Sequence, residues 1–379
     1  MLIGVPTEVV PGERRVALVP ETIGRLAKAG SSVLVQRGAG LAASFTDEAY
    51  EAAGATLAAD AAEVFAKADF IAKVARPTSE ELELTRPGQT LLAFLSPLGD
   101  PASVEAYAKR KITALSMDAI PRTTRAQSMD ALSSQANIAG YKAVLMAAVE
   151  SPRFLPMLTT AAGTIRPAKV FVLGAGVAGL QAIATARRLG AVVSGFDTRA
   201  VVKEQVESLG AKFLELDLGV DGAGTGGYAK ALTAEQEAKQ QSLLAEYMHG
   251  MDIIITTAAV PGRRAPLLIT EDAVKGMKPG SVIVDLAAET GGNCALTESG
   301  KTVVKYGVKI VGTTNIPSTM PFDASVLYSR NVFTLLQLIA KDGTLNLDMN
   351  DEIIRGTTLV KDGEIVHEPT KSALAGSNA

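Results

Sequence analysis

An apolar strand that runs directly into a glycine-rich turn limits the possible folds of this chain more than any other feature. Residues 169–181 read KVFVLGAGVAGLQ, with glycine at positions 174, 176 and 179. In a dinucleotide-binding βαβ unit, Gly174 permits the tight turn, Gly176 lets backbone N–H groups approach a pyrophosphate, and Gly179 lets the helix pack closely on the strand. The free N–H groups at the start of that helix attract phosphate. The predicted pyrophosphate-binding residues are Gly174, Ala175, Gly176, Val177 and Gly179.

The same unit offers an acidic residue for an adenosine ribose. A helical stretch ends at Gly190, and the strand Val192–Phe196 that follows it closes with Asp197. A carboxylate there accepts hydrogen bonds from both ribose hydroxyls and repels a 2′-phosphate, which favours NAD(H). Arg199, two residues further on, is an argument for NADP(H), so the preference for NAD(H) rests on the position of Asp197. The structural alternative for the whole motif is an ordinary glycine turn.

Short apolar runs alternate with helical stretches on both sides of this unit. The strands predicted in the first series are Leu2–Val5, Ser32–Val35, Phe70–Val74, Thr90–Leu95 and Ile112–Ser116, and those in the second are Val170–Leu173, Val192–Phe196, Ile253–Thr257, Ser281–Leu286 and Lys309–Val311. Alternation of this kind predicts parallel sheets covered by helices on both faces. We therefore expect an α/β fold of two Rossmann-like, doubly wound domains.

Two long helices, about 128–150 and 324–340, flank the second series and predict an insertion topology. Asp362-Gly363, between two apolar runs, predicts a hairpin in the tail. We assign 1–127 and 320–379 to a discontinuous first domain and 128–319 to the dinucleotide-binding domain. The long helices would join the two domains, with a ligand cleft between them.

Composition excludes several classes of function. The length of 379 residues, with 47% apolar residues, suits two domains with full cores. A net charge of −3 gives no electrostatic reason to bind nucleic acid. The one cysteine, Cys294, excludes an internal disulfide and a cysteine-built zinc site, and we predict no metal site. The lack of a signal peptide or a long apolar run predicts a cytoplasmic chain.

A polar cluster precedes the first long helix. Residues 121–135 read PRTTRAQSMDALSSQ, in which Gln127, Asp130 and Ser133 or Ser134 recur at three- and four-residue steps. If the helix has begun there, these side chains share one face, and an amide, an acid and a hydroxyl can hold a carboxamide and ribose hydroxyls. Capping of the helix N-terminus explains the same residue types equally well. Spacing alone does not choose between the two.

Several long segments together resemble the NAD(H)-binding component, domain I, of proton-translocating NAD(P)+ transhydrogenase. They are RAQSMDALSSQANIAGYKA, FVLGAGVAGLQAIATARRLGA, GGYAK and MKPGSVIVDLAAETGGN, with the opening GVPTEVVPGERRVALVP. The resemblance implies a homodimer that binds NAD(H) and docks on a membrane proton-channel subunit and on a separate NADP(H)-binding component. Hydride would pass directly between the two nicotinamides, coupled to proton translocation. The implied location is the cytoplasmic face of the inner membrane, held there through partner subunits.

The resemblance also implies roles for individual residues. Arg122, Gln127, Asp130 and Ser133 would form the loop at the nicotinamide and its ribose, and Gly174 to Gly179 would bind the pyrophosphate. Asp197, Thr198 and Arg199 would surround the adenosine ribose, and Ala259, in the turn after a strand, would line the nicotinamide side. Gly227 and Tyr228, in the glycine-rich stretch 222–228, would belong to a mobile loop that closes over the nucleotide. Without the resemblance, Tyr228 would be taken for a surface tyrosine.

Alanine dehydrogenase is the rival family with the same two-domain plan. It carries an arginine near Arg15 and a lysine near Lys73, both present here, but a histidine where this chain has Leu95-Ser96-Pro97. Oxidation of an amino acid moves a proton and needs a positioned acid or base, whereas hydride exchange between two nicotinamides depends on positioning. His249 and His367, the two histidines, are expected to be structural. A non-catalytic NAD(H) sensor is the third hypothesis.

Overall fold

The computed structural model describes residues 1–216, 233–260, 262–341 and 343–377, and it divides the chain into two compact α/β units. Unit 1 comprises Met1–Gln135 and Pro317–Ala379, and unit 2 comprises Ala136–Ile316. The first break lies within the long helix α6 (Ala131–Glu150), and the second lies in the short 3-10 turn Ile316–Thr319. The domain boundaries that we placed after residues 127 and 319 stay predictions.

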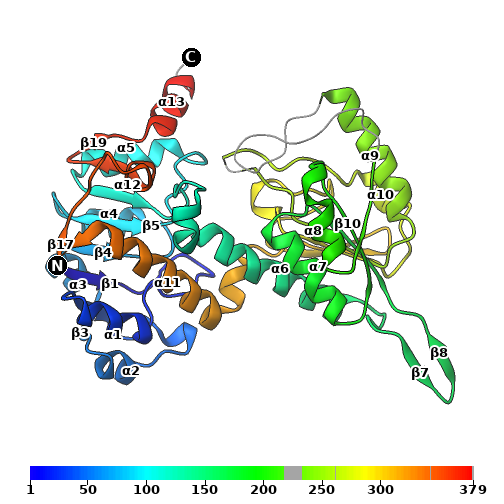
Figure 1. Ribbon diagram of the computed structural model, residues 1–379, viewed down its shortest axis with the longest axis horizontal. Helices are drawn as coiled ribbons and strands as arrows, with labels where there is room; N and C mark the ends of the chain where they lie inside the picture. Colours follow the sequence, from blue (N-terminus) through cyan, green and yellow to red (C-terminus); the bar gives the residue numbers. More distant parts are fainter. Residues whose placement is uncertain (217–232, 261, 342, 378–379) are drawn as a thin grey trace. The chain divides into compact units, whose positions relative to one another are not determined.

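Unit 1 is built on an eight-stranded sheet in the order β19-β18-β6-β5-β4-β1-β2-β3 (Figure 1). Strands β1 to β6 are parallel, and their order, 3-2-1-4-5-6, is that of a doubly wound fold. The strands are β1 (Leu2–Val5), β2 (Ser32–Gln36), β3 (Thr56–Ala58), β4 (Phe70–Ala72), β5 (Thr90–Ala93), β6 (Thr113–Ser116), β18 (Thr358–Lys361) and β19 (Glu364–Ile365). Its helices are α1 (Pro20–Lys28), α2 (Asp47–Ala52), α3 (Ala61–Lys67), α4 (Ser79–Glu83), α5 (Pro101–Lys109), α11 (Pro321–Ile339), α12 (Glu352–Thr357) and α13 (Glu368–Ser377), with a small ladder of β16 (Ala340–Lys341) and β17 (Thr344–Leu345).

The tail of the chain completes the sheet of unit 1. β18 runs antiparallel to β6, and β19 pairs back onto β18 through the turn at Asp362 and Gly363. Both turn residues have positive φ, 53° and 84°, as a two-residue hairpin turn requires. The hairpin predicted from the Asp-Gly pair is confirmed.

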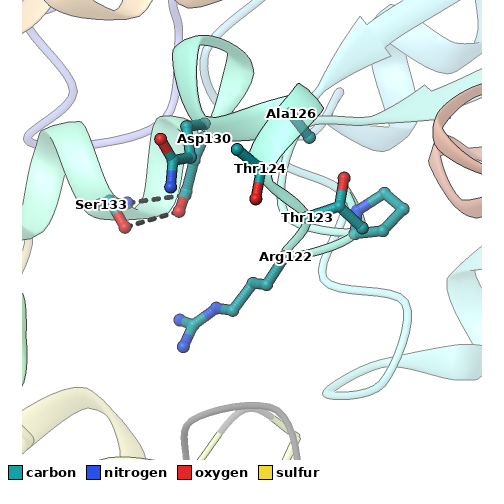
Figure 2. A pocket seen from close by; sticks show the side chains of 8 residues that line it. Arg122, Thr123, Thr124, Ala126, Asp130 and Ser133 are labelled. Atoms are coloured by element: carbon teal, nitrogen blue, oxygen red, sulfur yellow. Dashed lines mark hydrogen bonds between the residues drawn. The ribbon is translucent and has the colours of Figure 1, made fainter.

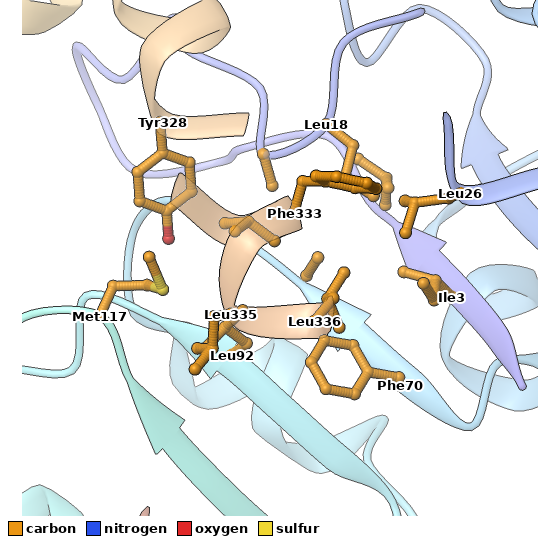
Figure 3. Packing of buried hydrophobic residues seen from close by; sticks show 14 of the residues in the cluster. Ile3, Leu18, Leu26, Phe70, Leu92, Met117, Tyr328, Phe333, Leu335 and Leu336 are labelled. Carbon is orange, nitrogen blue, oxygen red and sulfur yellow. The ribbon is translucent and has the colours of Figure 1, made fainter. Parts of the chain in front are cut away.

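Apolar side chains cover both faces of this sheet. On one face, Leu335, Leu336 and Tyr328 of α11 pack over strand residues such as Phe70 and Leu92 (Figure 3). On the other face, α3 and α5 pack against alternate strand residues such as Ile71 and Leu91. Strands buried on both faces are the reason why the sequence reads as apolar runs rather than as alternation.

Unit 2 contains a seven-stranded sheet in the order β11-β10-β9-β12-β13-β15-β14. All pairs are parallel except β14 with β15 at one edge, so the six parallel strands repeat the 3-2-1-4-5-6 order. The strands are β9 (Lys169–Leu173), β10 (Val192–Phe196), β11 (Lys212–Phe213), β12 (Ile253–Thr256), β13 (Val282–Asp285), β14 (Thr302–Lys305) and β15 (Val308–Val311). The helices are α7 (Val177–Arg188), α8 (Lys203–Ser208), α9 (Ala234–Met248) and α10 (Glu271–Lys275). Residues of α6, α7 and α8 cover one face, and α9 and α10 cover the other.

The expected fold class is confirmed, since both units are parallel-sheet α/β structures. The sequence did not predict the strands β3, β11 and β14, nor the hairpin of β7 (Leu158–Thr160) and β8 (Gly163–Ile165), whose residues are all exposed. It protrudes from the remainder of unit 2 (Figure 1). Strand prediction from buried apolar residues cannot find a hairpin that buries none of its side chains.

Candidate functional site

The three glycines of the β9–α7 turn differ in what surrounds them. Gly174 has φ +96°, a conformation that favours glycine, and a Cβ added at Gly179 would lie 1.8 Å from the carbonyl oxygen of Gly174. The structure of the turn itself therefore requires glycine at both positions, with or without a ligand. A Cβ at Gly176 would meet no atom within 4 Å. Gly176 is also the N-cap residue of α7, which begins at Val177, and no side chain caps that end. The open space thus lies where the N–H groups at the start of a helix can donate to phosphate oxygens, as a bound pyrophosphate requires.

This turn lies at the point where the strand order of unit 2 reverses. β9 and β12 are neighbours, and Thr257, directly after β12, donates from Oγ1 to the carbonyl oxygen of Gly174 at 3.0 Å. Crevices at such reversal points are the usual ligand sites of doubly wound sheets. The turn Thr257-Ala258-Ala259 is therefore next to the glycine turn, and the role of Ala259 in lining the nicotinamide side stays a prediction.

Asn293 holds the backbone of this second turn. Its side-chain amide donates to the carbonyl oxygens of Ala258 and Pro266, both at 2.8 Å, and accepts from the N–H of Ala258 at 3.1 Å. Asp285, at the end of β13, accepts from the N–H of Asn293 at 2.8 Å. Both side chains are fully buried. Sequence reasoning missed this pair, although Asn293 lies within the segment MKPGSVIVDLAAETGGN.

Asp197 lies at the end of β10, as predicted, with its carboxylate already engaged. Oδ2 accepts from the N–H of Ala175 at 2.8 Å, which joins the acid to the glycine turn. The guanidinium of Arg199 donates to both oxygens, at 2.9 and 2.7 Å. Burial raises the pKa of Asp197, but the hydrogen bonds from Arg199 and Ala175 outweigh it, and the net pKa is lowered. Arg199 therefore serves as a counter-ion of Asp197 here.

The polar cluster of unit 1 lines one cavity of about 330 Å³. Its lining includes all four residues named from the sequence, Arg122, Gln127, Asp130 and Ser133, together with Thr123 and Thr124. In Figure 2 the Arg122 side chain extends away from the backbone of this segment, and dashed lines join Asp130 to Ser133. The oxygen of the Thr123 hydroxyl is buried without a hydrogen-bond partner in the protein. An arginine, an amide, an acid and hydroxyls around one cavity suit a ligand rich in polar groups.

The structure corrects the expected start of the long helix. Residues Thr124–Met129 form a 3-10 turn, and α6 begins at Ala131 rather than near residue 128. Gln127 therefore does not share a helix face with Asp130. Asp130 accepts from the N–H of Ser133 at 2.8 Å and from its hydroxyl at 2.6 Å, the geometry of a helix N-cap. Asp130 therefore caps α6 and also lines the cavity, and the alternative that it binds a carboxamide or ribose hydroxyls stays a prediction.

The reversal point of the unit 1 sheet, between β1 and β4, is filled by a buried ionic cluster. Lys73, directly after β4, has no exposed surface, and its Nζ lies 2.6 Å from Glu81 and 3.1 Å from Glu8. Burial alone lowers the pKa of Lys73, but the two carboxylates outweigh it and the net pKa is raised. Tyr328 closes the cluster by donating to the carbonyl oxygen of Lys73 at 2.7 Å.

Arg15 is likewise held by the protein's own groups. Glu13 accepts from its Nε and Nη2 at 2.8 and 2.6 Å, and Gln135 accepts from Nη1 at 2.9 Å. The exposed fraction of the Arg15 side chain is 8%. Arg15 and Lys73, shared with the rival family, are thus both enclosed in ion pairs.

The segment at which the rival family carries a histidine is also fixed. The carboxylate of Asp118 accepts from the N–H groups of Leu95 and Ser96 at 3.0 and 2.9 Å. His249 follows the last residue of α9, and His367 is buried with its Nδ1 2.8 Å from the hydroxyl of Thr370. Within the described residues, no group of three or more His, Cys, Asp or Glu side chains is arranged to hold a metal ion.

Gly227 and Tyr228, and the stretch 222–228 that contains them, lie outside the described residues. Their predicted role in a loop over the nucleotide stays a prediction. Thr198 is described and lies between the paired Asp197 and Arg199. In the described ranges, no helix is both long and apolar enough to cross a membrane.

Comparison with known proteins decides the family. The family model "Alanine dehydrogenase/PNT, C-terminal domain" matches residues 143–368, and the corresponding N-terminal model matches residues 4–139. The chain belongs to the alanine dehydrogenase/PNT family. It is 51% identical to an NAD(P) transhydrogenase subunit alpha chain of Rhodospirillum rubrum, with both chains covered completely.

In both structure and sequence, the chain is more similar to the transhydrogenases of this family than to the alanine dehydrogenases. The crystal structure of transhydrogenase from Sinorhizobium meliloti matches 97% of this chain and 100% of its own, with a TM-score of 0.88 and 46% identity. Alanine dehydrogenase of Bacillus subtilis is 29% identical over 97% of this chain and 93% of its own. The resemblance to transhydrogenase is confirmed, and alanine dehydrogenase is a more distant relative.

Proposed function

We propose that this chain is the NAD(H)-binding subunit of a proton-translocating NAD(P)+ transhydrogenase. It would hold NAD(H) while hydride passes directly to or from NADP(H) on a partner component, coupled to proton translocation. The observation that carries the proposal is the open space beside Gly176, with Asp197 joined to the same turn, in a chain 51% identical to a transhydrogenase alpha subunit.

The proposed chemistry requires positioning rather than proton transfer. A nicotinamide supplies or accepts the hydride, and no proton moves at the reacting carbons, so the chain's own residues need only orient the ring and exclude water. Arg122, Gln127, Asp130 and Ser133 would contact the nicotinamide and its ribose from their cavity, and Thr257 to Ala259 would line the ring. The enclosure of Lys73 and Arg15 in ion pairs supports an enzyme without an acid–base group of its own.

A homodimer belongs to the proposal, and the β7–β8 hairpin supports it. Two-stranded hairpins are marginal in water unless they pack on something. Large apolar side chains are exposed on and beside this one: Phe154, Met157, Leu158, Ile165 and Val192. A second copy of the chain would cover them. Replacing Met157 and Ile165 with serine should convert a dimer into a monomer in light scattering, and a monomeric unmodified protein would contradict the dimer.

The partners complete the proposed assembly. An NADP(H)-binding component would supply the second nicotinamide, and a membrane proton-channel subunit would hold this chain at the cytoplasmic face of the inner membrane. We expect co-purification with both from solubilised membranes.

The central test is a hydride-exchange assay. The protein is mixed with NADH, an NADP(H)-loaded partner component and an oxidised nicotinamide analogue, and analogue reduction is followed by absorbance. Reduction that requires both components supports the proposal, and NADH binding without exchange contradicts it. NADH consumption with pyruvate and ammonium, without a partner, would establish the alanine dehydrogenase alternative. Nucleotide binding without turnover under any combination would favour an NAD(H) sensor.

A further inference from the structure

We propose that Arg199 is a built-in competitor for the carboxylate of Asp197, so that NAD(H) gains its ribose contacts only by displacing the guanidinium. This inference rests on the proposed function, because it assigns the adenosine ribose to Asp197. It adds that the Arg199 side chain lowers the affinity of that site for NAD(H).

The hydrogen-bonding capacity of Asp197 is fully used in the structure. Oδ1 accepts from the backbone N–H and the Nε of Arg199, both at 2.9 Å, and Oδ2 accepts from the N–H of Ala175 at 2.8 Å and from Nη2 of Arg199 at 2.7 Å. A carboxylate offers about four acceptor positions, so four donors leave no place for a ribose hydroxyl.

Only two of these four donors can leave without moving the backbone. The N–H groups of Ala175 and Arg199 are fixed by the glycine turn and by the loop after β10. The two side-chain donors, Nε and Nη2 of Arg199, depart together when the guanidinium rotates away. A ribose with two hydroxyls would replace this pair of donors one for one.

The exchange costs some of the binding free energy. The ion pair is shielded from solvent, with side-chain exposures of 16% for Arg199 and 7% for Asp197. Its charge-assisted, bidentate hydrogen bonds are stronger than those of neutral hydroxyls. The ribose hydroxyls therefore add less affinity than they would at a carboxylate with vacant acceptor positions. Lower affinity allows the nucleotide to dissociate faster, which suits a protein that must exchange its nucleotide in each turnover.

The test compares two nucleotides on three proteins. NADH and its analogue lacking the adenosine 2′-hydroxyl are titrated by calorimetry onto the unmodified protein, Arg199→Met and Lys203→Met. Arg199→Met keeps the side-chain length but removes the donors, and we expect NADH to bind about tenfold tighter. The affinity lost with the 2′-hydroxyl should be larger in Arg199→Met than in the unmodified protein.

Lys203→Met is the matched control for charge. It removes one cation four residues further on, and Lys203 pairs with Glu215 rather than with Asp197. Its affinity for NADH should stay within about twofold of the unmodified protein, because exposed pairs contribute little. Tightening in both variants would reflect charge alone and would overturn the inference.

Other outcomes separate this inference from the proposed function. Equal or weaker NADH binding by Arg199→Met, or an equal loss with the 2′-deoxy analogue, overturns the competitor. No NADH binding by the unmodified protein overturns the proposed function itself. Should Arg199→Met fail to fold in a thermal melt, Arg199→Lys replaces it, and we expect tightening of about threefold because one ammonium cannot donate bidentately.

Discussion

The two units share one strand order, but the crevices at their reversal points differ. In unit 2, between β9 and β12, the crevice is formed by a glycine turn with open space beside Gly176. In unit 1, the equivalent place between β1 and β4 is occupied by Lys73 with Glu8 and Glu81, all buried. The same fold therefore provides one crevice with room for a ligand and one closed by ion pairs.

The side chains in the loops that follow the strands, and not the fold, therefore decide whether a reversal point can bind a ligand. Glycine has no side chain, so the crevice stays open for the phosphates of a ligand. A lysine between two glutamates fills the crevice, and its charge is neutralised by the protein's own carboxylates. We therefore expect the stability of unit 1 to depend on the ion pairs in its crevice, and ligand binding by unit 2 to depend on the absence of side chains in its glycine turn.

The largest effect should come from Lys73→Met. The substitution leaves Glu8 and Glu81 buried without their cation, which typically costs about 3–5 kcal/mol of unfolding free energy. Urea denaturation measures the loss. Lys67→Met, at an exposed lysine paired with Glu63, is the control and should cost less than about 1 kcal/mol. Equal, small losses in both variants would mean that the ionic cluster does not hold unit 1 together.

Gly179→Ala should be the next most damaging change. Its Cβ would lie 1.8 Å from the carbonyl oxygen of Gly174, so the turn and α7 must separate. Overpacking of this kind costs about 1–3 kcal/mol, measured by the same denaturation. Unchanged stability would show that the turn can relax, and that its geometry is set elsewhere.

Gly176→Ala should affect binding and spare stability. Its Cβ meets no protein atom within 4 Å, and its φ of −78° suits alanine. The methyl group would occupy the space assigned to the pyrophosphate, and we expect NADH affinity to fall by about tenfold or more, roughly 1.4 kcal/mol. Calorimetric titration of NADH measures this. Unimpaired binding would place the phosphates away from the turn.

Asp130→Ala should cost about 1 kcal/mol through loss of the α6 cap. Asp60→Ala removes a comparable cap from α3 and is the matched control. Equal losses in thermal melts are expected, but only Asp130→Ala should slow hydride exchange. If both variants exchange hydride at the normal rate, Asp130 is a cap and nothing more.

The smallest expected effect is on pH dependence. Burial lowers the pKa of His367 from its usual value of 6.5, so the unfolded chain takes up this proton at a higher pH than the folded chain. Its contribution to stability is present above about pH 6.5 and is lost as pH falls through the folded pKa. In His367→Gln, denaturation midpoints between pH 7 and 5.5 should depend less on pH. An unchanged slope would assign the dependence to other groups.

The proposed site could be predicted from the sequence where single segments carry it. The glycine turn and Asp197 lie in one βαβ unit, and residues 121–133 form one continuous stretch, so local order brings their members together. The start of α6 could not be predicted, because a capping aspartate and the first polar residue of a helix face look alike. The β7–β8 hairpin was not predicted because none of its side chains is buried, and strands are recognised from buried apolar residues.

By itself, the sequence determined the strand and helix alternation, the glycine turn, the acid at the end of β10 and the tail hairpin, since each depends on short-range patterns. Tertiary structure alone decided that Lys73 meets Glu8, that Asn293 holds Ala258, and that Arg199 turns back onto Asp197. The first two pairs join residues far apart in the chain, and the third depends on a side-chain rotamer. Packing fixes such contacts, and no periodicity encodes them.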